Sequence, residues 1–390
     1  MKIGIVTQPL QLNYGGLLQN YALQEVLRRL GHEPCTLNWT WPHTYFQDHE
    51  FRRLLSNVKT RIMTKMHLGA GRQLVKYKPS DTEYTVIAQN TDRFIREHIV
   101  KTRTITSEDG FREVFEAGNY YALISGSDQV WRPKYSAPFL KEMFLDFAKD
   151  KKVVRLAYAA SFGMDEWEFS PKMTEKCSDL AKKYDAISVR EDSGIALCCE
   201  HLGVTAAHVL DPTLLLRKED YVNLVKEAGE TASPGSLFYY ILDPSVAKTS
   251  FVERVADEMN LHPFKVMPRY PRSEWTKPRI KHHIDDCVYP SLTQWLRGFM
   301  DAEMTVVDSF HGMVFSILFN KPFWVIGNKS RGLSRFTSLL TLLGLENRLL
   351  DISELKIVEV STPIDWKQVN VWLDRLRQQS QDWLLKSLQK

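Results

Sequence analysis

Residues 1–31 read MKIGIVTQPLQLNYGGLLQNYALQEVLRRLG, and the pattern predicts a strand, a turn and a helix in that order. Residues 3–7 are a short apolar run of the kind that forms a buried strand. Residues 13–16 contain two glycines and favour a turn. Apolar residues then recur at helical spacing up to Gly31, namely Leu18, Ala22, Val26 and Leu30. A strand that leads through a turn into a helix is the repeating unit of an α/β fold.

The same alternation continues along the chain. Strand-like runs follow at residues 121–125, 153–161, 186–189 and 207–210, and helical patterns lie between several of them. A second set of strands is expected at residues 237–241, 264–267, 304–307 and 323–326. Helices are expected at residues 245–260, 291–302, 312–319 and 334–343. Such alternation predicts mainly parallel, doubly wound sheets, so the fold class is α/β with Rossmann-like units.

The chain length indicates two domains, because 390 residues exceed what one hydrophobic core usually organises. We expect residues 1–215 to form an N-terminal α/β domain with a basic helical insertion at about 45–100. Residues 216–390 are expected to form a C-terminal α/β domain. It should end in a helical segment at residues 365–388. Two doubly wound domains that face each other enclose a cleft, and ligands of open α/β sheets bind beyond the carboxyl ends of the strands.

Composition is that of an ordinary globular protein, with 44% hydrophobic and 25% charged residues. The five cysteines match no zinc or redox spacing, which favours a reducing compartment. The apolar run at the start of the chain is too short for a signal peptide. No run of ~18 apolar residues occurs elsewhere. We therefore expect a cytoplasmic protein.

Positive charge is concentrated in residues 51–78, which hold eight Lys or Arg residues and no Asp or Glu. Apolar residues recur there at helical spacing, so the segment is interpreted as a basic amphipathic helix. Such a helix either packs on the N-terminal domain or contacts anionic headgroups at the inner face of a membrane, or an acidic acceptor. No nucleic-acid-binding motif or matching basic stripe occurs elsewhere, so we expect no nucleic-acid partner.

The strongest chemical signal is the stretch TVVDSFHGMV at residues 305–314, which runs from a strand into a helix. His311 should lie at the helix N-terminus, where free N–H groups and the helix dipole favour an anion. Its imidazole can donate a proton or pair with phosphate. Ser309 and Gly312 flank it and are assigned to substrate binding. The alternative is a histidine satisfied within the core.

Two further segments place cations at strand ends. Arg190, in ISVREDS at residues 187–193, has a planar fork that suits a phosphate or carboxylate. The alternative is a salt bridge with Glu191 or Asp192. The basic loop at residues 328–335 carries Arg331 and Arg335, which are candidates for anion contact, although the loop also fits a solvated turn.

Two glycine-containing turns supply polar candidates. In ISGSDQVW at residues 124–131, a glycine lets the backbone approach a ligand, and the following side chains can bind hydroxyl groups. The candidates here are Gly126, Ser127, Asp128 and Gln129, with Asp128 as a proton acceptor from a sugar hydroxyl. The alternative is a helix N-cap. The turn at 13–20 lacks the full G-x-G-x-x-G pattern, which disfavours dinucleotide binding. Its candidates are Asn13, Tyr14, Gly15, Gly16 and Gln19.

Six sequence blocks in a fixed order carry a family resemblance. They are NYGGLLQNYAL (13–23), GSDQVW (126–131), YAASFG (158–163), SVREDSG (188–194), LDPTLL (210–215) and DSFHG (308–312). This order resembles the polysaccharide pyruvyl transferase family, over roughly residues 3–345. The resemblance implies a two-domain, GT-B-like fold. It also implies a transferase that uses phosphoenolpyruvate as co-substrate, with no metal and no other cofactor.

The resemblance implies that a pyruvate ketal forms on a sugar hydroxyl pair of a cell-surface polysaccharide or exopolysaccharide, or of its lipid-linked oligosaccharide precursor. We place the acceptor on the N-terminal domain and the donor on the C-terminal domain. His311 matches the motif histidine of the family, and Arg190 resembles its anion-binding arginine. With His311 and Asp128 as catalytic residues, His311 would either protonate the methylene carbon of the donor or stabilise the leaving phosphate, and the acceptor hydroxyl would attack the donor carbon.

One departure concerns the position two residues before the histidine. Family members often have arginine there, and this chain has Ser309. Arg331 and Arg335 are the candidates to supply the missing cation. Two other functions fit the same fold: a GT-B-like glycosyltransferase that uses a nucleotide sugar, and a non-catalytic member of the family.

Overall fold

The computed structural model describes residues 1–41, 77–328 and 332–389. The basic helix expected at residues 51–78 therefore lies outside the described residues, except for its last two positions, and so does Arg331. Of the insertion expected at about 45–100, the structure describes helix α3 (Asp81–His98). Ser80 caps this helix through the backbone N–H of Glu83, and the Glu83 side chain accepts from the Ser80 N–H in return.

The described part of residues 1–215 contains a parallel sheet of six strands in the order β2-β1-β3-β4-β5-β6. Their bounds are β1 Lys2–Val6, β2 Glu33–Thr36, β3 Ala122–Ser125, β4 Val154–Ala160, β5 Ala186–Val189 and β6 Ala207–His208. The accompanying helices are α1 Tyr14–Arg29, α4 Glu108–Gly118, α5 Pro133–Ser136, α6 Leu140–Met143, α7 Pro171–Ala181 and α8 Asp192–Leu197. β3 is buried along its whole length, as expected of a strand covered on both faces.

A second parallel sheet, of five strands among the described residues, has the order β11-β10-β9-β7-β8. The strands are β7 Leu237–Tyr240, β8 Pro263–Phe264, β9 Met304–Val307, β10 Phe323–Ile326 and β11 Leu349–Leu350. The helices are α9 Lys218–Glu227, α10 Val246–Met259, α11 Lys277–His282, α12 Leu292–Asp301, α13 Phe310–Leu318 and α14 Ser334–Leu342. The predicted fold class is confirmed, with parallel order in both sheets. The sequence pattern did not predict the short strands β2 and β11.

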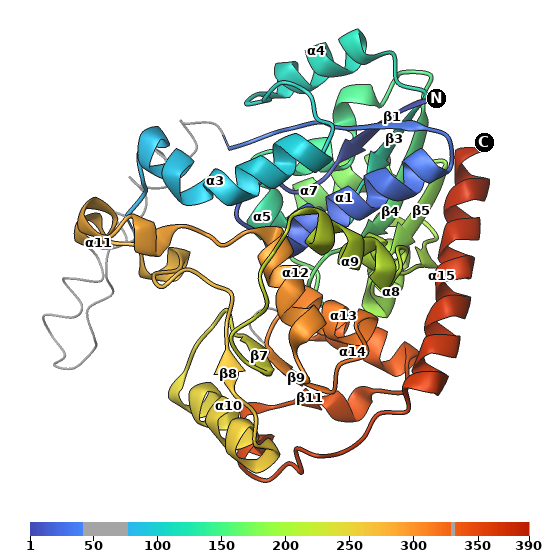
Figure 1. Ribbon diagram of the computed structural model, residues 1–390. Helices are drawn as coiled ribbons and strands as arrows, with labels where there is room; N and C mark the ends of the chain where they lie inside the picture. The colour runs from blue at the N-terminus through green and yellow to red at the C-terminus, as the bar shows by residue number, and fades with distance from the viewer. Residues whose placement is uncertain (42–76, 329–331, 390) are drawn as a thin grey trace, which may run out of the picture.

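The last helix, α15 (Trp366–Leu388), connects the second half of the chain back to the first sheet (Figure 1). The Oγ of Ser380 accepts from the Leu210 backbone N–H at 3.0 Å, and Arg377 Nε donates to the Leu214 carbonyl at 2.7 Å. The expected C-terminal helical segment is thus a single helix, and it packs on β4. Among the described residues, none of the helices combines the length and apolar character needed to cross a membrane.

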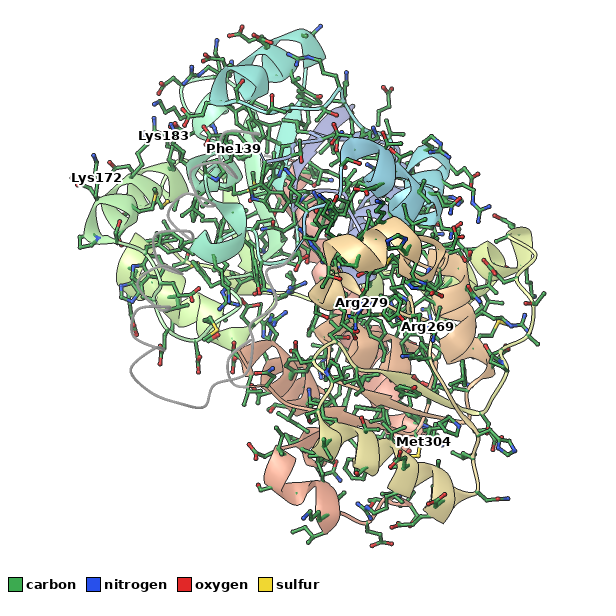
Figure 2. All side chains as sticks on the ribbon, turned by 90° about the vertical axis from the view of Figure 1, so that its left-hand side faces the viewer. Phe139, Lys172, Lys183, Arg269, Arg279 and Met304 are labelled. Atoms are coloured by element: carbon green, nitrogen blue, oxygen red, sulfur yellow. The ribbon has the colours of Figure 1, made fainter. Side chains whose placement is uncertain are left out.

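A segment at residues 265–290 extends from the second sheet to α3 of the N-terminal half (Figure 1). The Tyr289 N–H donates to the Ile87 carbonyl at 3.1 Å, and Asn90 Nδ2 donates to the Tyr289 carbonyl at 2.8 Å. Figure 2 shows Arg269 and Arg279 on this segment. The contact fixes one side of the space between the two sheets.

Candidate functional site

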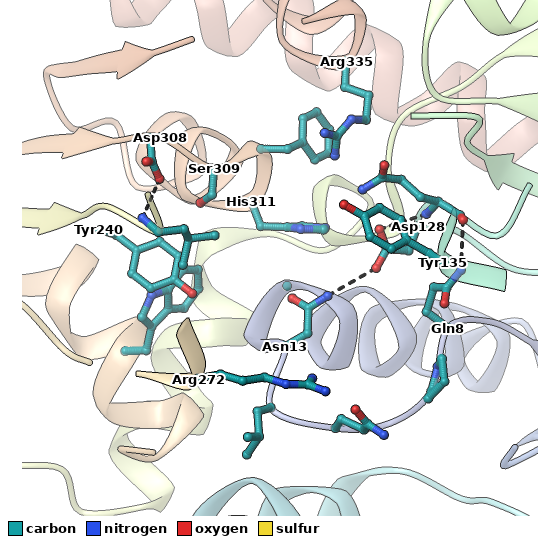
Figure 3. A pocket seen from close by; sticks show the side chains of 18 of the residues that line it. Gln8, Asn13, Asp128, Tyr135, Tyr240, Arg272, Asp308, Ser309, His311 and Arg335 are labelled. Carbon is teal, nitrogen blue, oxygen red and sulfur yellow. Dashed lines mark hydrogen bonds between the residues drawn. The ribbon is translucent and has the colours of Figure 1, made fainter. Parts of the chain in front are cut away.

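A cavity of about 380 Å³ lies between the two sheets. It is bounded by residues that follow β1, β3, β7 and β9, so it occupies the carboxyl ends of strands from both domains, as expected for open α/β sheets. Its lining includes Gln8, Asn13, Gly15, Asp128, Gln129 and Tyr135 from the first half of the chain, and Tyr240, Arg272, Tyr289, Ser309, His311 and Arg335 from the second. Figure 3 shows most of these side chains around the cavity.

His311 occupies the first turn of α13, directly after β9. Ser309 is the N-cap of this helix, and its Oγ accepts from the Gly312 backbone N–H at 3.1 Å. Only 11% of the His311 side chain is exposed, and it lines the cavity. The predicted position of His311, between a strand and a helix, is therefore confirmed. Ser309 both caps the helix and lines the cavity.

Asp211 lies behind His311 and was not among the residues predicted from the sequence. Its Oδ2 accepts from Ser127 Oγ at 2.9 Å and from Arg190 Nη1 at 2.6 Å, and it lies 3.6 Å from His311 Nε2. Its Oδ1 accepts from the backbone N–H and Oγ1 of Thr213. Burial alone would raise the pKa of this carboxyl. The neighbouring His311 and Arg190 charges, with these hydrogen bonds, hold the pKa well below its ordinary range. Asp211 belongs to the LDPTLL block, and membership of this block is the sequence feature that could have marked it as a site residue.

Arg190 lies behind the cavity wall, and it is not among the residues that line the cavity. Its side chain is fully buried; Nη2 is 3.2 Å from Asp128 Oδ1, and the guanidinium stacks over the Phe310 ring at 4.7 Å. The salt bridge that the sequence analysis left open exists, but its main partners are Asp211 and Asp128, with Glu191 at 4.0 Å. In this arrangement Arg190 holds the wall together, and its expected direct contact with an anion stays a prediction.

Asp128 presents its carboxylate to the cavity from a backbone in the left-handed region, with φ of 71°. Its Oδ1 accepts from the Gln129 N–H at 2.9 Å, and its Oδ2 lies 3.4 Å from Asn13 Nδ2. No helix begins at Ser127 or Asp128 among the described residues, so the helix-cap alternative is wrong. A left-handed aspartate held by tertiary contacts is a feature found at functional sites.

The remaining candidates from the sequence divide into lining and supporting residues. Asn13, Gly15, Gln129 and Arg335 line the cavity. Gly126, Ser127, Gly16, Gln19, Tyr14 and Gly312 do not, and they support its walls. Gln19, for example, donates to Thr7 Oγ1 at 2.9 Å beneath the turn. Tyr14 donates to the Pro290 carbonyl and packs against Trp295, which ties the two domains together.

Arg335 and Arg272 bring positive charge to the cavity (Figure 3). Arg335 is buried at the start of α14, and burial, together with the nearby Arg190 charge, lowers its pKa to about 10. Burying a cation is costly, so an anion in the cavity would relieve that cost. Arg272 was not predicted. It begins a short 3₁₀ helix, Arg272–Glu274, in the connection between β8 and α11, and this connection matches no sequence motif.

Asp308 also lines the cavity. It accepts from the backbone N–H groups of Leu242 and Asp243, and from Lys248 Nζ at 2.6 Å. Both side chains of this ion pair are almost fully buried. The carboxylate therefore fixes the turn that follows β7 and the start of α10 beside the turn that carries His311. Among the described residues, no group of three or more His, Cys, Asp or Glu side chains is arranged to hold a metal.

The model of one family, polysaccharide pyruvyl transferase, matches residues 13–330, which is more than half of the chain. The chain belongs to this family. The match contains the six sequence blocks, so the resemblance drawn from them is confirmed. The polysaccharide pyruvyl transferases are a family of transferases. The cavity residues from Asn13 to Asn328 lie within the matched range.

Solved structures of sugar-nucleotide enzymes were compared with this pyruvyl transferase family member. A structure described as UDP-N-acetylglucosamine 2-epimerase from Listeria monocytogenes has a TM-score of 0.50 and 9% identity, over 97% of this chain and 90% of that one. UDP-GlcNAc 2-epimerase from Neisseria meningitidis has a TM-score of 0.48 and 9% identity, over 100% and 99% of the two chains. At this identity the Listeria structure supports the two-domain, GT-B-like fold alone. No curated protein sequence matches the chain.

Proposed function

We propose that this protein transfers the pyruvyl group of phosphoenolpyruvate to a pair of hydroxyls on a sugar and so forms a pyruvate ketal. The observation that carries the proposal is the position of His311. A nearly enclosed imidazole lies in the first turn of α13, in an interdomain cavity that also contains Arg335 and the carboxylate of Asp128. An acid, an anion-binding cation and a base on facing walls are the groups that this transfer needs.

In the proposed reaction, His311 gives a proton to the methylene carbon of the donor, which becomes a methyl group. Asp128 accepts the proton of the first sugar hydroxyl as its oxygen bonds to the adjacent carbon. The bond from that carbon to the phosphate oxygen then breaks, and the second hydroxyl closes the ketal. The two hydroxyls lose two protons in total: one is balanced by the new methyl hydrogen, and the other leaves with phosphate.

Charge supports an anionic donor. Arg335 lines the cavity while largely removed from water, and the helix N-terminus of α13 adds its partial positive charge beside His311. Asp308, which also lines the cavity, is already paired with Lys248. The cavity has room for a three-carbon donor and part of a sugar, since small-ligand sites occupy about 300–1,000 Å³.

The acceptor is proposed to be a sugar of a surface polysaccharide or exopolysaccharide, or of its lipid-linked precursor. A cytoplasmic enzyme would meet a lipid-linked acceptor at the inner face of the membrane. The basic segment at residues 51–78 is the candidate for that contact.

Incubation of the protein with phosphoenolpyruvate and a panel of free and lipid-linked glycans tests the proposal. We expect phosphate release together with a glycan mass gain of one pyruvate less one water. His311→Ala should abolish this gain without unfolding the protein. Arg190→Lys should lower it strongly, since an ammonium cannot reproduce the forked contacts to Asp211 and Asp128.

A thermal-shift panel distinguishes the other functions. Stabilisation by nucleotide sugars but not by phosphoenolpyruvate would favour a glycosyltransferase. Stabilisation by neither class would favour a non-catalytic protein. Either result contradicts the proposed reaction.

A further inference from the structure

The contact between Asp211 and His311 joins the two domains. Asp211 follows β6 of the first sheet, and His311 begins the helix after β9 of the second. Their closest atoms, Asp211 Oδ2 and His311 Nε2, are 3.6 Å apart. This distance is slightly longer than a hydrogen bond.

Asp211 is held firmly in place. Ser127 and Arg190 donate to one carboxylate oxygen, and Thr213 donates twice to the other. The side chain is fully buried and is not part of the cavity lining. A carboxylate so fixed cannot approach a substrate, but it can orient a neighbouring ring.

The two ring nitrogens of His311 have different surroundings. Nε2 is buried and faces Asp211. Nδ1 lies beside the backbone of Gly15, and it has no hydrogen-bond partner among the described residues. Because an ionised carboxylate only accepts, the nitrogen that faces it should carry a proton. Nδ1 is then the nitrogen left for a substrate.

We propose that Asp211 is a positioning residue that holds the Nε2–H of His311 across the domain interface and so makes Nδ1 the nitrogen that exchanges a proton with the substrate. The proposal rests on the proposed function for its chemistry. Nδ1–H of the imidazolium gives its proton to the donor carbon, whose double-bond electron pair forms the new C–H bond. The ring stays neutral with its proton on Nε2, and Asp211 remains ionised.

Other contacts keep the two domains in the relation that this pair needs. The Asp192 backbone N–H donates to Ser338 Oγ at 3.0 Å, and the guanidinium of Arg190 stacks on Phe310 beside His311. At Gly332, with φ of +84°, a methyl group would lie 2.0 Å from the Gly163 carbonyl, so the backbones of the two domains touch there. Separation of the domains would remove Asp211 from the ring, so the positioning of His311 depends on these interdomain contacts.

The test is 15N NMR of the full-length protein labelled at histidine, with the His311 signals assigned from His311→Gln. In the wild type we expect the neutral His311 ring to carry its proton on Nε2. Asp211→Asn should shift the ring toward a mixture of tautomers. Asp146→Asn removes another buried, ion-paired carboxylate that does not line the cavity, and it should leave the His311 signals unchanged. A wild-type ring protonated on Nδ1, or signals unaltered in Asp211→Asn, would overturn the proposal.

A kinetic arm separates positioning from general structural damage. Asp211→Asn should lower kcat roughly 10²- to 10⁴-fold, the range seen when an orienting aspartate is lost. Its affinity for phosphoenolpyruvate should change less than about threefold, because Asp211 does not line the cavity. A large affinity loss with kcat preserved contradicts the proposal. If Asp211→Asn does not fold, Asp211→Glu replaces it, because glutamate keeps the negative charge but displaces it. We again expect a lower kcat with little change in the affinity for phosphoenolpyruvate.

The two arms also distinguish this proposal from the proposed function. If the wild type transfers no pyruvyl group but its ring is protonated on Nε2 and responds to Asp211→Asn, the positioning proposal stands and the reaction is wrong. If the wild type makes the ketal and the ring does not respond to Asp211→Asn, the reaction stands and the positioning proposal is wrong.

Discussion

Gly15 lies directly against the imidazole of His311. A methyl group at Gly15 would be 2.1 Å from His311 Nδ1 and 2.4 Å from its Cγ. Gly15 is within helix α1, and it does not have a positive φ. Glycine is therefore required here because another domain's ring approaches the backbone, and not because the backbone conformation excludes other residues.

Gly15→Ala should separate stability from activity. Alanine in place of glycine within a helix favours folding by about 0.5–1 kcal/mol, whereas the added methyl must displace the His311 ring. We expect pyruvyl transfer to fall roughly 100-fold, since misplacement of a reacting group by about 1 Å has that effect. Gly110→Ala, in α4 and away from the cavity, is the control and should keep wild-type turnover. Wild-type turnover in Gly15→Ala would show that the ring position is unimportant.

We predict that the buried Lys248–Asp308 ion pair stabilises the fold. Both side chains are nearly fully buried and their closest atoms are 2.6 Å apart. Lys248→Met leaves a buried carboxylate with backbone donors but no cation, and removal of one partner of a buried pair costs about 3–5 kcal/mol. Urea unfolding should show this loss. Lys151→Met breaks an exposed pair with Glu116 and should have little effect. Similar losses in the two variants would contradict the importance of burial.

The sequence predicted the place of the site better than its internal pairing. Ligands of facing α/β domains bind beyond the carboxyl ends of their strands, so His311 and Asp128 could be expected at one interdomain cleft, and both line the cavity. The sequence could not show whether Arg190 faces a ligand or a carboxylate. The answer depends on Asp211, which follows strand β6. Its Oδ2 lies 2.6 Å from Arg190 Nη1.

Irregular segments explain the residues that were missed. Arg272 reaches the cavity from a connection without helical or strand periodicity, and its place depends on the contact of Tyr289 with α3. Periodicity and strand-end rules apply only to regular elements. The left-handed backbone of Asp128 was equally hidden, because nothing local distinguishes it from a helix cap.

Glu142 makes stability depend on pH. Burial raises its pKa from the ordinary 4.5 to about 7. Between these values the folded protein keeps a proton that the unfolded chain has released. The Glu142 contribution to the free energy of unfolding therefore falls as pH rises through this window. Glu142→Gln removes this dependence.

Urea unfolding of the wild type and Glu142→Gln at pH 5 and pH 8 checks this prediction. From pH 5 to pH 8, the free energy of unfolding of Glu142→Gln should rise by about 2–3 kcal/mol relative to that of the wild type. Glu116→Gln, at an exposed site, is the control and should show no such change. An equal difference between Glu142→Gln and the wild type at both pH values would contradict the raised pKa.

Arg272 is predicted to contribute to substrate binding. It lines the cavity, and its guanidinium forms no ion pair among the described residues. Arg272→Ala should weaken phosphoenolpyruvate binding roughly tenfold or more, as expected for one lost charge-assisted contact. Arg269→Ala, on the same segment but outside the cavity, should bind normally in calorimetric titrations. Equal affinities of the two variants would remove Arg272 from the site.

Arg335 is the described candidate for the cation that Ser309 does not supply. It is buried beside the Phe310 ring, at 5.9 Å, and it lines the cavity. Arg335→Ala should weaken phosphoenolpyruvate binding roughly ten- to a hundredfold, since a charge-assisted hydrogen bond contributes about 1.5–3 kcal/mol. The phosphoenolpyruvate affinity of Arg331→Ala should be measured in the same experiment, although Arg331 lies outside the described residues.

Ser309→Arg should partly restore binding in the Arg335→Ala background, because it adds charge beside His311. The substitution also removes the cap of α13, at a cost of about 1 kcal/mol in stability. Ser309→Ala loses the same cap without gaining charge, so comparison of the two isolates the charge effect. Rescue by Ser309→Arg and not by Ser309→Ala is the expected result. If neither Arg335→Ala nor Arg331→Ala changes the affinity, the loop arginines do not compensate, and a different donor becomes the better explanation.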